Sequence, residues 1–158
     1  MNLAAAMFLS LHGWMPLIQR ESRAEHVDAM TLAAIVWHES RGDPGAFFKE
    51  RGAACSVGLG GVYVPDCSPA RVAVLRDPSR NLRVSAKILA ANQRWCARHR
   101  RERRCAAGER AFRGGGGVNC YGGNSTRFAV EIKKIRRALA RALVTSPRRS
   151  SPARTGRR

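Results

Sequence analysis

The chain has 158 residues, of which 44% are hydrophobic and 25% are charged. This length and balance predict one folded domain with a core of its own, and they exclude a disordered or fibrous protein. Lysine and arginine number 29 against 11 acidic residues, and the net charge of +18 favours polyanionic partners such as nucleic acid, an anionic membrane or an acidic cell-wall polymer.

The first 23 residues form an apolar segment without a clear targeting signal. The stretch MNLAAAMFLSLHGWMPL has no basic residue before it and no small-x-small cleavage site, both of which a secretory signal would have. It is also too short to cross a membrane. We expect residues 1–23 to form a first helix or a degenerate signal, and we expect no membrane span.

Residues 24–144 are predicted to form a mainly α domain, whose first helix covers residues 24–40. Apolar side chains recur there every three or four positions, as on one face of a helix: Val27, Met30, Ala34 and Trp37. Gly42 suits the left-handed position that ends a helix, and Pro44 cannot continue one.

Glycine-rich and helical segments alternate after this helix. Residues 52–68 hold four glycines and alternate valine or leucine with small residues, which predicts a structured loop or a short hairpin. A short helical turn is expected at PARVAVLRD, residues 69–77. A longer helix is expected over residues 78–98, with these side chains facing inward: Leu82, Ala86, Leu89 and Trp95.

The C-terminal part is strongly basic. Residues 98–117 end in four glycines and are expected to form a mobile surface loop. A final helix carries apolar residues at steps of four and three: Phe128, Ile132, Ile135, Leu139 and Leu143. Residues 145–158 are predicted to be a disordered basic tail. No helix-turn-helix, zinc-finger, RRM or KH signature occurs, so we expect no specific nucleic-acid partner.

Five cysteines are many for a reduced cytosolic protein of this size. No CxxC pair occurs and no histidine lies at zinc-finger spacing from a cysteine pair, so we expect neither a metal site nor a cofactor. One interpretation is two local disulfides, Cys55–Cys67 and Cys96–Cys105, which leave Cys120 over. The other is five buried or inert thiols, because cysteine often behaves as a small hydrophobic residue.

Glu39 occupies the last turn of the helix predicted over residues 24–40. A carboxyl group there lies at the negative pole of the helix, and the neighbouring Trp37 favours partial burial. Both effects favour the protonated form, which is the form that a general acid needs. The alternative is an ordinary last-turn residue that faces water.

Other polar residues near Glu39 are expected to be structural. His38 lies about 100° away from it round the helix axis, so we expect no dyad between the two. Asp43, Asp66 and Asp77 lie at turns or at a helix entry, where aspartate supports the backbone. None of them is a compelling second carboxylate for glycoside hydrolysis.

Four stretches follow one another along the chain: ESRGDPGA, which begins at Glu39, then VGLGG, NLRVSAKIL and NCYGGNSTRFAVEI. In this order they resemble the catalytic domain of lytic transglycosylases of the soluble type, which is related to goose-type lysozyme. That family shows Glu-Ser-x-x-x-Pro-x-Ala, then Gly-Leu-Met-Gln, then an Asn-Ile helix, then Ala-Tyr-Asn-Ala-Gly before a terminal helix. The resemblance covers residues 24–140 and implies a lysozyme-like helical domain with glycine-rich loops and little or no sheet.

By this resemblance Glu39 is the catalytic acid/base, and Ser40 helps to orient the substrate or the carboxylate. Gly58 and Leu59 match the start of the segment that lines the substrate groove. Tyr121 matches the tyrosine that hydrogen-bonds the catalytic glutamate in the family.

Asn81 and Leu89 match the family's structural helix, in which the asparagine caps or braces. Three positions depart from the family pattern. Gly60 and Gly61 stand where Met and Gln are expected, and Gly122 stands where an Asn follows the Tyr. Substrate contacts of those side chains are missing, so either backbone groups of the glycine-rich loop replace them or this enzyme is specialised or weak.

The resemblance implies a peptidoglycan lytic transglycosylase, which cleaves the β-1,4 bond between N-acetylmuramic acid and N-acetylglucosamine and leaves a 1,6-anhydro product. Two alternatives stay open: a lysozyme-like hydrolase of the same bond, and a non-catalytic basic module that binds cell wall or nucleic acid. The expected partner is the peptidoglycan glycan strand, and the enzyme could belong to a secretion or phage-associated assembly. A substrate outside the cytoplasmic membrane and the cysteine content predict a periplasmic or exported protein.

Overall fold

The computed structural model describes residues 3–98, 121 and 126–145. Over these residues the chain is mainly α with one small antiparallel sheet, which confirms the predicted fold class. The helices are α1 (Leu3–His12), α2 (Met15–Glu25), α3 (Ala29–Ser40), α4 (Pro69–Leu75), α5 (Pro78–Arg98) and α6 (Thr126–Thr145). The strands are β1 (Phe47–Lys49), β2 (Cys55–Val57) and β3 (Val62–Val64).

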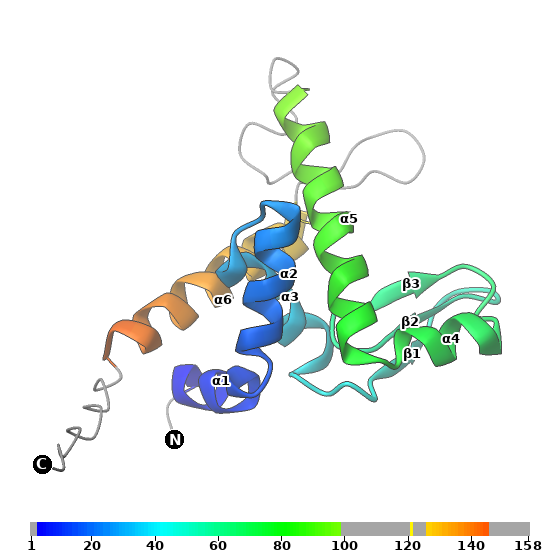
Figure 1. Ribbon diagram of the computed structural model, residues 1–158, viewed down its shortest axis with the longest axis horizontal. Coiled ribbons are helices and arrows are strands. Elements are labelled where there is room, and N and C mark those ends of the chain that lie inside the picture. The colour runs from blue at the N-terminus through cyan, green and yellow to red at the C-terminus, as the bar shows by residue number, and fades with distance from the viewer. Residues whose placement is uncertain (1–2, 99–120, 122–125, 146–158) are drawn as a thin grey trace, which may run out of the picture.

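Helix α3 is the central element. Helices α1, α2 and α6 pack around it, and α5 stands between this helical part and the sheet with α4 (Figure 1). The five apolar residues at 32–36 are all buried, so α3 is covered on every side rather than along one stripe. The helix that carries Glu39 is therefore held from all directions.

The described part of the N-terminal segment is helical and belongs to the same core. Met7 and Leu11 of α1 and Ile18 of α2 are fully buried, in one cluster with Leu32 of α3 and Ile132 of α6. Helix formation agrees with the first-helix interpretation of the segment, and the degenerate signal stays an untested alternative. No helix in the described part of the chain is both long and apolar enough to cross a membrane.

The helix expected over residues 24–40 is wrong at its start. Helix α2 ends before His26, which is left-handed with a φ of 57°, and α3 begins only after Asp28. The Asp28 carboxylate caps α3, because it accepts hydrogen bonds from the Thr31 backbone N–H at 2.9 Å and from the Thr31 hydroxyl at 2.6 Å. The apolar periodicity thus runs across two helices, and periodicity alone does not reveal the cap between them.

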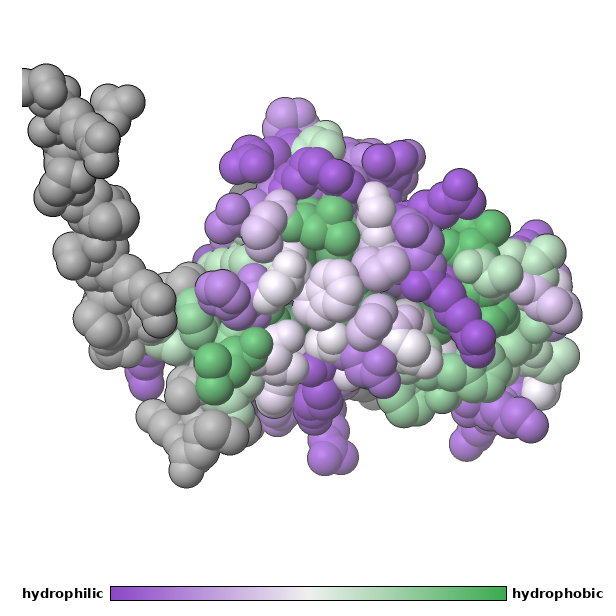
Figure 2. All heavy atoms as spheres, turned by 60° about the horizontal axis from the view of Figure 1, so that its bottom comes forward, coloured by the Kyte–Doolittle hydropathy of each residue, from purple (hydrophilic) through white to green (hydrophobic). Residues whose placement is uncertain are grey.

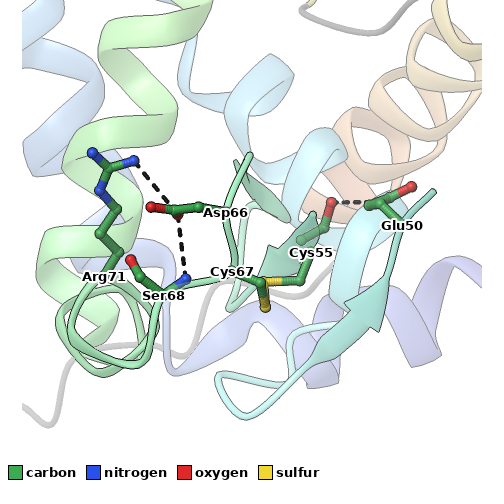
Figure 3. The surroundings of a disulfide bond; sticks show 7 residues. Glu50, Cys55, Asp66, Cys67, Ser68 and Arg71 are labelled. Atoms are coloured by element: carbon green, nitrogen blue, oxygen red, sulfur yellow. Dashed lines mark hydrogen bonds and ion pairs between the residues drawn. A yellow bond between two sulfur atoms is a disulfide. The ribbon is translucent and has the colours of Figure 1, made fainter. Parts of the chain in front are cut away.

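Residues 52–68 form a hairpin, which is one of the two predicted alternatives. Strand β2 pairs with β3, and β1 joins the other side of β2. The Cys55–Cys67 disulfide ties β2 to the turn after β3 (Figure 3), so this predicted pair is confirmed. Inward valines of β2 and β3 pack with Leu75 of α4 as a second, smaller core.

The later helices follow the predicted pattern closely. Helix α5 has the predicted bounds, with Leu82, Ala86 and Leu89 buried but Trp95 only half-buried. In α6 the buried residues include Ile132 and Leu139.

Other predictions fall outside the described residues. The basic loop at residues 98–117 and the tail at residues 145–158 lie outside them except at their first residues. Cys105 and Cys120 lie outside them as well, and so does the side chain of Leu143. The pairing of Cys96 with Cys105 therefore stays a prediction.

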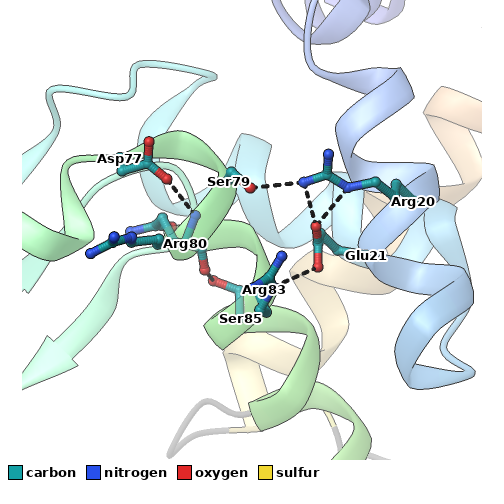
Figure 4. Close-up of polar contacts among 8 residues, drawn as sticks. Arg20, Glu21, Asp77, Ser79, Arg80, Arg83 and Ser85 are labelled. Atoms are coloured by element: carbon teal, nitrogen blue, oxygen red, sulfur yellow. Dashed lines mark hydrogen bonds and ion pairs between the residues drawn. The ribbon is translucent and has the colours of Figure 1, made fainter.

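A buried carboxylate joins α2 to α5. Glu21 is 3% exposed, and one of its oxygens accepts two hydrogen bonds from the Arg20 guanidinium, at 2.6 and 2.8 Å (Figure 4). The Arg83 guanidinium lies 3.4 Å from the other oxygen, and Arg20 also donates to the Ser79 hydroxyl at 2.7 Å. Two cations thus compensate the buried charge, as burial of a carboxylate requires. These contacts hold α2 against the first turns of α5.

The surface is chemically uneven. Hydrophobic residues gather at the end of the molecule that carries the sheet and α4, whereas hydrophilic side chains cover much of the remaining visible face (Figure 2). Exposed large hydrophobic side chains on these elements are Phe47, Phe48, Tyr63 and Val74. By contrast α6 holds six basic residues: Arg127, Lys133, Lys134, Arg136, Arg137 and Arg141. Helix α6 therefore carries a strong positive charge, with Glu131 as its one acidic residue.

The cap residue Asp28 makes the fold sensitive to acid. Burial opposes its charge, but the hydrogen bonds from Thr31 and from Arg136 Nε, the latter at 2.8 Å, outweigh burial and hold the pKa of Asp28 below 3.8. Since this pKa is lower in the folded than in the unfolded chain, the carboxylate stabilises the fold above about pH 4. That contribution is lost as the pH falls through the folded-state pKa.

Two substitutions at Asp28 test this. Asp28→Ala is expected to lower the free energy of unfolding by about 1 kcal/mol at pH 7, because it removes the cap. Asp28→Asn keeps a cap acceptor that does not titrate, so the stability gap between wild type and this variant should shrink from pH 7 to pH 3. Urea unfolding at both pH values measures it. A gap that is unchanged at pH 3 would contradict the assignment.

Candidate active site

Glu39 lies in the last turn of α3, where the chain leaves the helix. Arg41 follows with a φ of 58° and Gly42 with a φ of 87°, so Arg41 rather than the predicted Gly42 takes the first left-handed position. The Trp14 indole N–H donates to the Gly42 carbonyl at 2.9 Å and holds this turn. The Glu39 side chain remains 26% exposed, so its carboxyl group is accessible at a well-anchored helix end.

Glu39 lines a cavity of about 150 Å³ that is enclosed by α3, the β2–β3 hairpin, α5 and α6. Glu39 is the only carboxylate among the described residues that line it. Polar and aromatic groups surround the carboxylate together with two glycines. These lining residues include Gly60, Gly61, Tyr63, Ser85, Tyr121 and Phe128. The cavity thus combines one carboxyl group with aromatic side chains and with the backbone of two glycines.

Ser40 stabilises this site through hydrogen bonds to backbone groups. It is 6% exposed, and its single hydroxyl proton is shared between two carbonyl acceptors, with Oγ 2.8 Å from the Leu59 oxygen and 3.0 Å from the Val36 oxygen. The same oxygen accepts a hydrogen bond from the Gly42 N–H at 3.1 Å. Because Leu59 belongs to the hairpin loop, Ser40 ties the end of α3 to that loop. Of its two expected roles, the geometry fits orientation of Glu39 and not contact with a substrate.

Asn81 of α5 holds the same loop from another side. Its fully buried side chain accepts a hydrogen bond from the Gly60 N–H at 2.8 Å through Oδ1. Its Nδ2 donates to the Val57 carbonyl at 2.8 Å and to the Leu75 carbonyl at 2.9 Å. Both amide protons and one oxygen lone pair are therefore used on backbone groups. The expected bracing role of Asn81 is confirmed.

The two glycines of the loop allow its backbone to approach Glu39 closely. A Cβ on Gly61 would lie 2.7 Å from Glu39 Oε2 and 2.9 Å from Glu39 Cβ. A Cβ on Gly60 would lie 2.0 Å from the Ser85 hydroxyl oxygen. Gly61 also has a φ of 56°, which glycine adopts without strain. Neither position accepts a side chain in this arrangement, so the backbone itself forms the wall beside the carboxylate.

His38 contacts Glu39, and the expectation that the two would stay apart is wrong. The His38 Nδ1 lies 3.3 Å from Glu39 Oε1, and the two groups form an ion pair when the imidazole is protonated. The ring also packs edge-on against Phe128 of α6, with 4.8 Å between ring centroids. The expectation considered only the direction of the Cβ atoms, whereas both side chains are long enough to meet at the helix end.

Tyr121 lines the same cavity as Glu39. The hydrogen bond between the two that the resemblance implies stays a prediction. Gly58 and Leu59 do not line it. Both are buried, and the next two residues, Gly60 and Gly61, take the lining positions instead. Gly122 lies outside the described residues. The glycine-rich segment therefore contacts the cavity two residues later than expected, and its part in a substrate groove stays a prediction.

Sequence reasoning missed Tyr63, Ser85 and Phe128 as cavity residues. Phe128 was assigned to the core face of the last helix, and Tyr63 lay within a hairpin whose outer face was not assigned. Ser85 carried a usable signal, because it follows Asn81 by four positions and so lies on the same helix face. The missing information was which faces of three separate elements meet.

The three aspartates take the structural roles expected of them. Asp43 accepts a hydrogen bond from the Gly45 N–H at 2.8 Å, and Asp66 accepts one from the Ser68 N–H at 3.3 Å. Asp77 accepts one from the Arg80 N–H at 2.7 Å, at the start of α5. Each therefore supports a turn or a helix entry, away from the Glu39 cavity.

Two comparisons with known proteins give no match. No protein-family model matches the chain, and no curated protein matches its sequence. A function has to be inferred from the motifs and from the geometry around Glu39.

Gly61→Ala is expected to destabilise the fold more than Gly52→Ala. Gly52 also has a positive φ, 72°, so alanine meets about 1–2 kcal/mol of left-handed strain at either position. A Cβ at Gly52 has nothing within 4 Å, whereas a Cβ at Gly61 must displace Glu39. We expect an additional loss of about 1–3 kcal/mol for Gly61→Ala in urea unfolding. Equal losses would mean that the loop does not press on Glu39.

Proposed function

We propose that the chain is a peptidoglycan lytic transglycosylase with Glu39 as its single catalytic acid/base. One observation carries the proposal: Glu39, the Gly60–Gly61 loop that directly follows the matching Gly58–Leu59 pair, and Tyr121 lie in successive stretches that resemble that family, and they line one cavity. The helical fold with a small sheet beside it is compatible with a lysozyme-like domain.

The proposed reaction uses one carboxyl group twice. Protonated Glu39 donates its proton to the glycosidic oxygen between N-acetylmuramic acid and N-acetylglucosamine, and the bond from that oxygen to the muramyl C1 breaks. The Glu39 carboxylate then takes the proton of the muramyl 6-hydroxyl, whose oxygen bonds to C1 and closes the 1,6-anhydro ring. No water is consumed and no second carboxylate is needed, which agrees with a cavity that has one carboxylate among its described lining residues.

Groups near Glu39 would assist the reaction in two ways, one by acting on Glu39 and the other by binding the sugar. A protonated His38 at 3.3 Å stabilises the carboxylate that forms when Glu39 has given up its proton. The Gly60 and Gly61 N–H groups are already bonded, to Asn81 Oδ1 and to the Gly58 carbonyl. Backbone contacts that replace the missing family side chains would therefore be made by carbonyl oxygens, which accept hydrogen bonds from sugar hydroxyl and acetamido groups.

A non-catalytic basic module is the second candidate, and the six basic residues of α6 favour it. Such a module would bind a polyanion, either cell wall or nucleic acid, through charge and without Glu39. Its affinity would fall steeply with salt and would be unaffected by loss of the Glu39 carboxylate.

A lysozyme-like hydrolase, by contrast, differs from the transglycosylase only in the acceptor, which is water in place of the 6-hydroxyl.

Digestion of purified sacculi by Glu39→Gln and wild-type protein tests the proposal. Wild type is expected to release muropeptides with the mass of 1,6-anhydro ends, and Glu39→Gln should reduce the rate at least about 10²-fold, because the amide cannot donate a proton as the acid does. Glu50→Gln is a matched control, since this exposed residue accepts a hydrogen bond from Ser56 that glutamine can also accept.

Each other result has a distinct meaning. Products with ordinary reducing ends would indicate a hydrolase. Full activity in Glu39→Gln would show that Glu39 is not the acid, and absence of any release by wild type would refute both enzymes.

We further propose that the protein is periplasmic or exported, where its substrate lies, and that it works on glycan strands alone or within a secretion or phage-associated assembly. The Cys55–Cys67 disulfide supports an oxidising compartment. In protein isolated from its own host, thiol titration under denaturing conditions is expected to find at most three of the five cysteines free. Five free thiols before reductant is added would contradict export.

A further inference from the structure

A second and larger cavity lies next to the one at Glu39. It has a volume of about 790 Å³ and is formed by residues of α1, α3 and α6 together with Arg41. Phe128 lines both cavities, and His38, which lines the larger one, lies 3.3 Å from Glu39. The two cavities therefore adjoin at Phe128, and the larger one begins next to the space at Glu39.

Cations dominate the polar lining of this second cavity. Arg41, Arg127 and Lys134 contribute three fixed positive charges, and His38 adds another when protonated. The one acidic lining residue, Glu131, is already paired with Lys134 at 3.1 Å. The lining therefore carries a net positive charge.

Arg41 is held in place before any ligand arrives. Its guanidinium lies 5.1 Å from the centre of the Trp37 ring, and its Nη1 donates to the Trp37 carbonyl at 2.7 Å. Within the described part of the chain no carboxylate pairs with Arg127, which is exposed. The two guanidinium groups are thus available to carboxylates, which they bind in a planar, bidentate manner.

The rest of the cavity is apolar. Met7 of α1 and Ile135 and Ala138 of α6 line it, together with the Trp37 and Phe128 rings. An apolar wall beside separated cations suits a ligand that alternates small apolar groups with carboxylates. A short acidic peptide has this chemistry, and a cavity of this volume lies within the range of small-ligand sites.

We infer that this cavity binds the carboxylate-bearing peptide stem of the muramyl residue whose glycosidic bond lies at Glu39. The inference rests on the proposed function, because the stem is a substituent of that sugar. It makes peptide-substituted glycan, with free stem carboxylates, the preferred substrate over peptide-free strands. Arg41 and Arg127 are then the residues that determine this preference.

Binding measured without turnover tests the inference. The probes are the disaccharide N-acetylglucosaminyl-N-acetylmuramic acid with a free-acid peptide stem, the same compound with amidated stem carboxylates, and the disaccharide without a peptide. Calorimetry on the full chain carrying Glu39→Gln should show the free-acid form binding about tenfold more tightly than the other two. Arg127→Ala in this background should remove most of that difference.

Arg71→Ala is the matched control, since Arg71 is exposed on α4, pairs with Asp66 at 3.6 Å and does not line this cavity. It should leave all three affinities unchanged. Equal affinities for the three probes, or an equal effect of Arg71→Ala and Arg127→Ala, would overturn the inference in favour of unspecific charge attraction. A short DNA duplex that displaces the free-acid probe at about 150 mM salt and binds more tightly than it would also overturn it.

The activity of wild type separates this inference from the proposed function. Cleavage of sacculi without any effect of stem carboxylates on binding would leave the enzyme in place and refute the peptide site. A carboxylate-dependent affinity in a protein that releases no muropeptides would keep the peptide site and refute the enzyme.

Discussion

The hydrogen bonds of two buried side chains, Ser40 and Asn81, to one hairpin loop determine the geometry around Glu39. One comes from α3 and the other from α5, so the loop is held between the two helices that flank the site. Each bond contributes only about 1 kcal/mol net, but loss of either partner would leave buried backbone groups unpaired. Since Gly61 packs directly on Glu39, fixing the loop also fixes the carboxylate.

The same arrangement explains why the site is built from backbone where side chains would be expected. With Ser85 and Glu39 so close to the loop, a Cβ at residue 60 or 61 would collide with one of them. The result is a small cavity with Glu39 as the one carboxylate among its described lining residues and with Phe128 at its border. Phe128, which packs edge-on against the His38 ring, also lines the larger cationic cavity, so the basic residues of α6 lie close to the Glu39 site of α3.

Local patterns predicted the elements well where a residue with a strong local effect marks the boundary. Pro78 starts α5, and glycines with alternating valines gave the hairpin its signature. The start of α3 was missed because Asp28 caps a helix through a hydrogen bond that apolar periodicity does not register. The contact between His38 and Glu39 was missed because the directions of the Cβ atoms at adjacent helix positions do not decide where the ends of long side chains lie. The ring of Phe128 in α6 packs against the His38 ring and holds it in place.

The sequence by itself determined a mainly α chain with a carboxylate at a helix end, and it gave the short hairpin and the local Cys55–Cys67 disulfide each as one of two alternatives. These features depend on residues near one another along the chain, whose propensities and spacing are visible in the letters. Only the tertiary structure decided which glycines line the site, that His38 contacts Glu39, and where the cationic cavity lies. Those outcomes depend on how α3, α5 and α6 pack against the hairpin, and residues up to about ninety positions apart meet there because burial of apolar surface, which is not directional, brings their elements together.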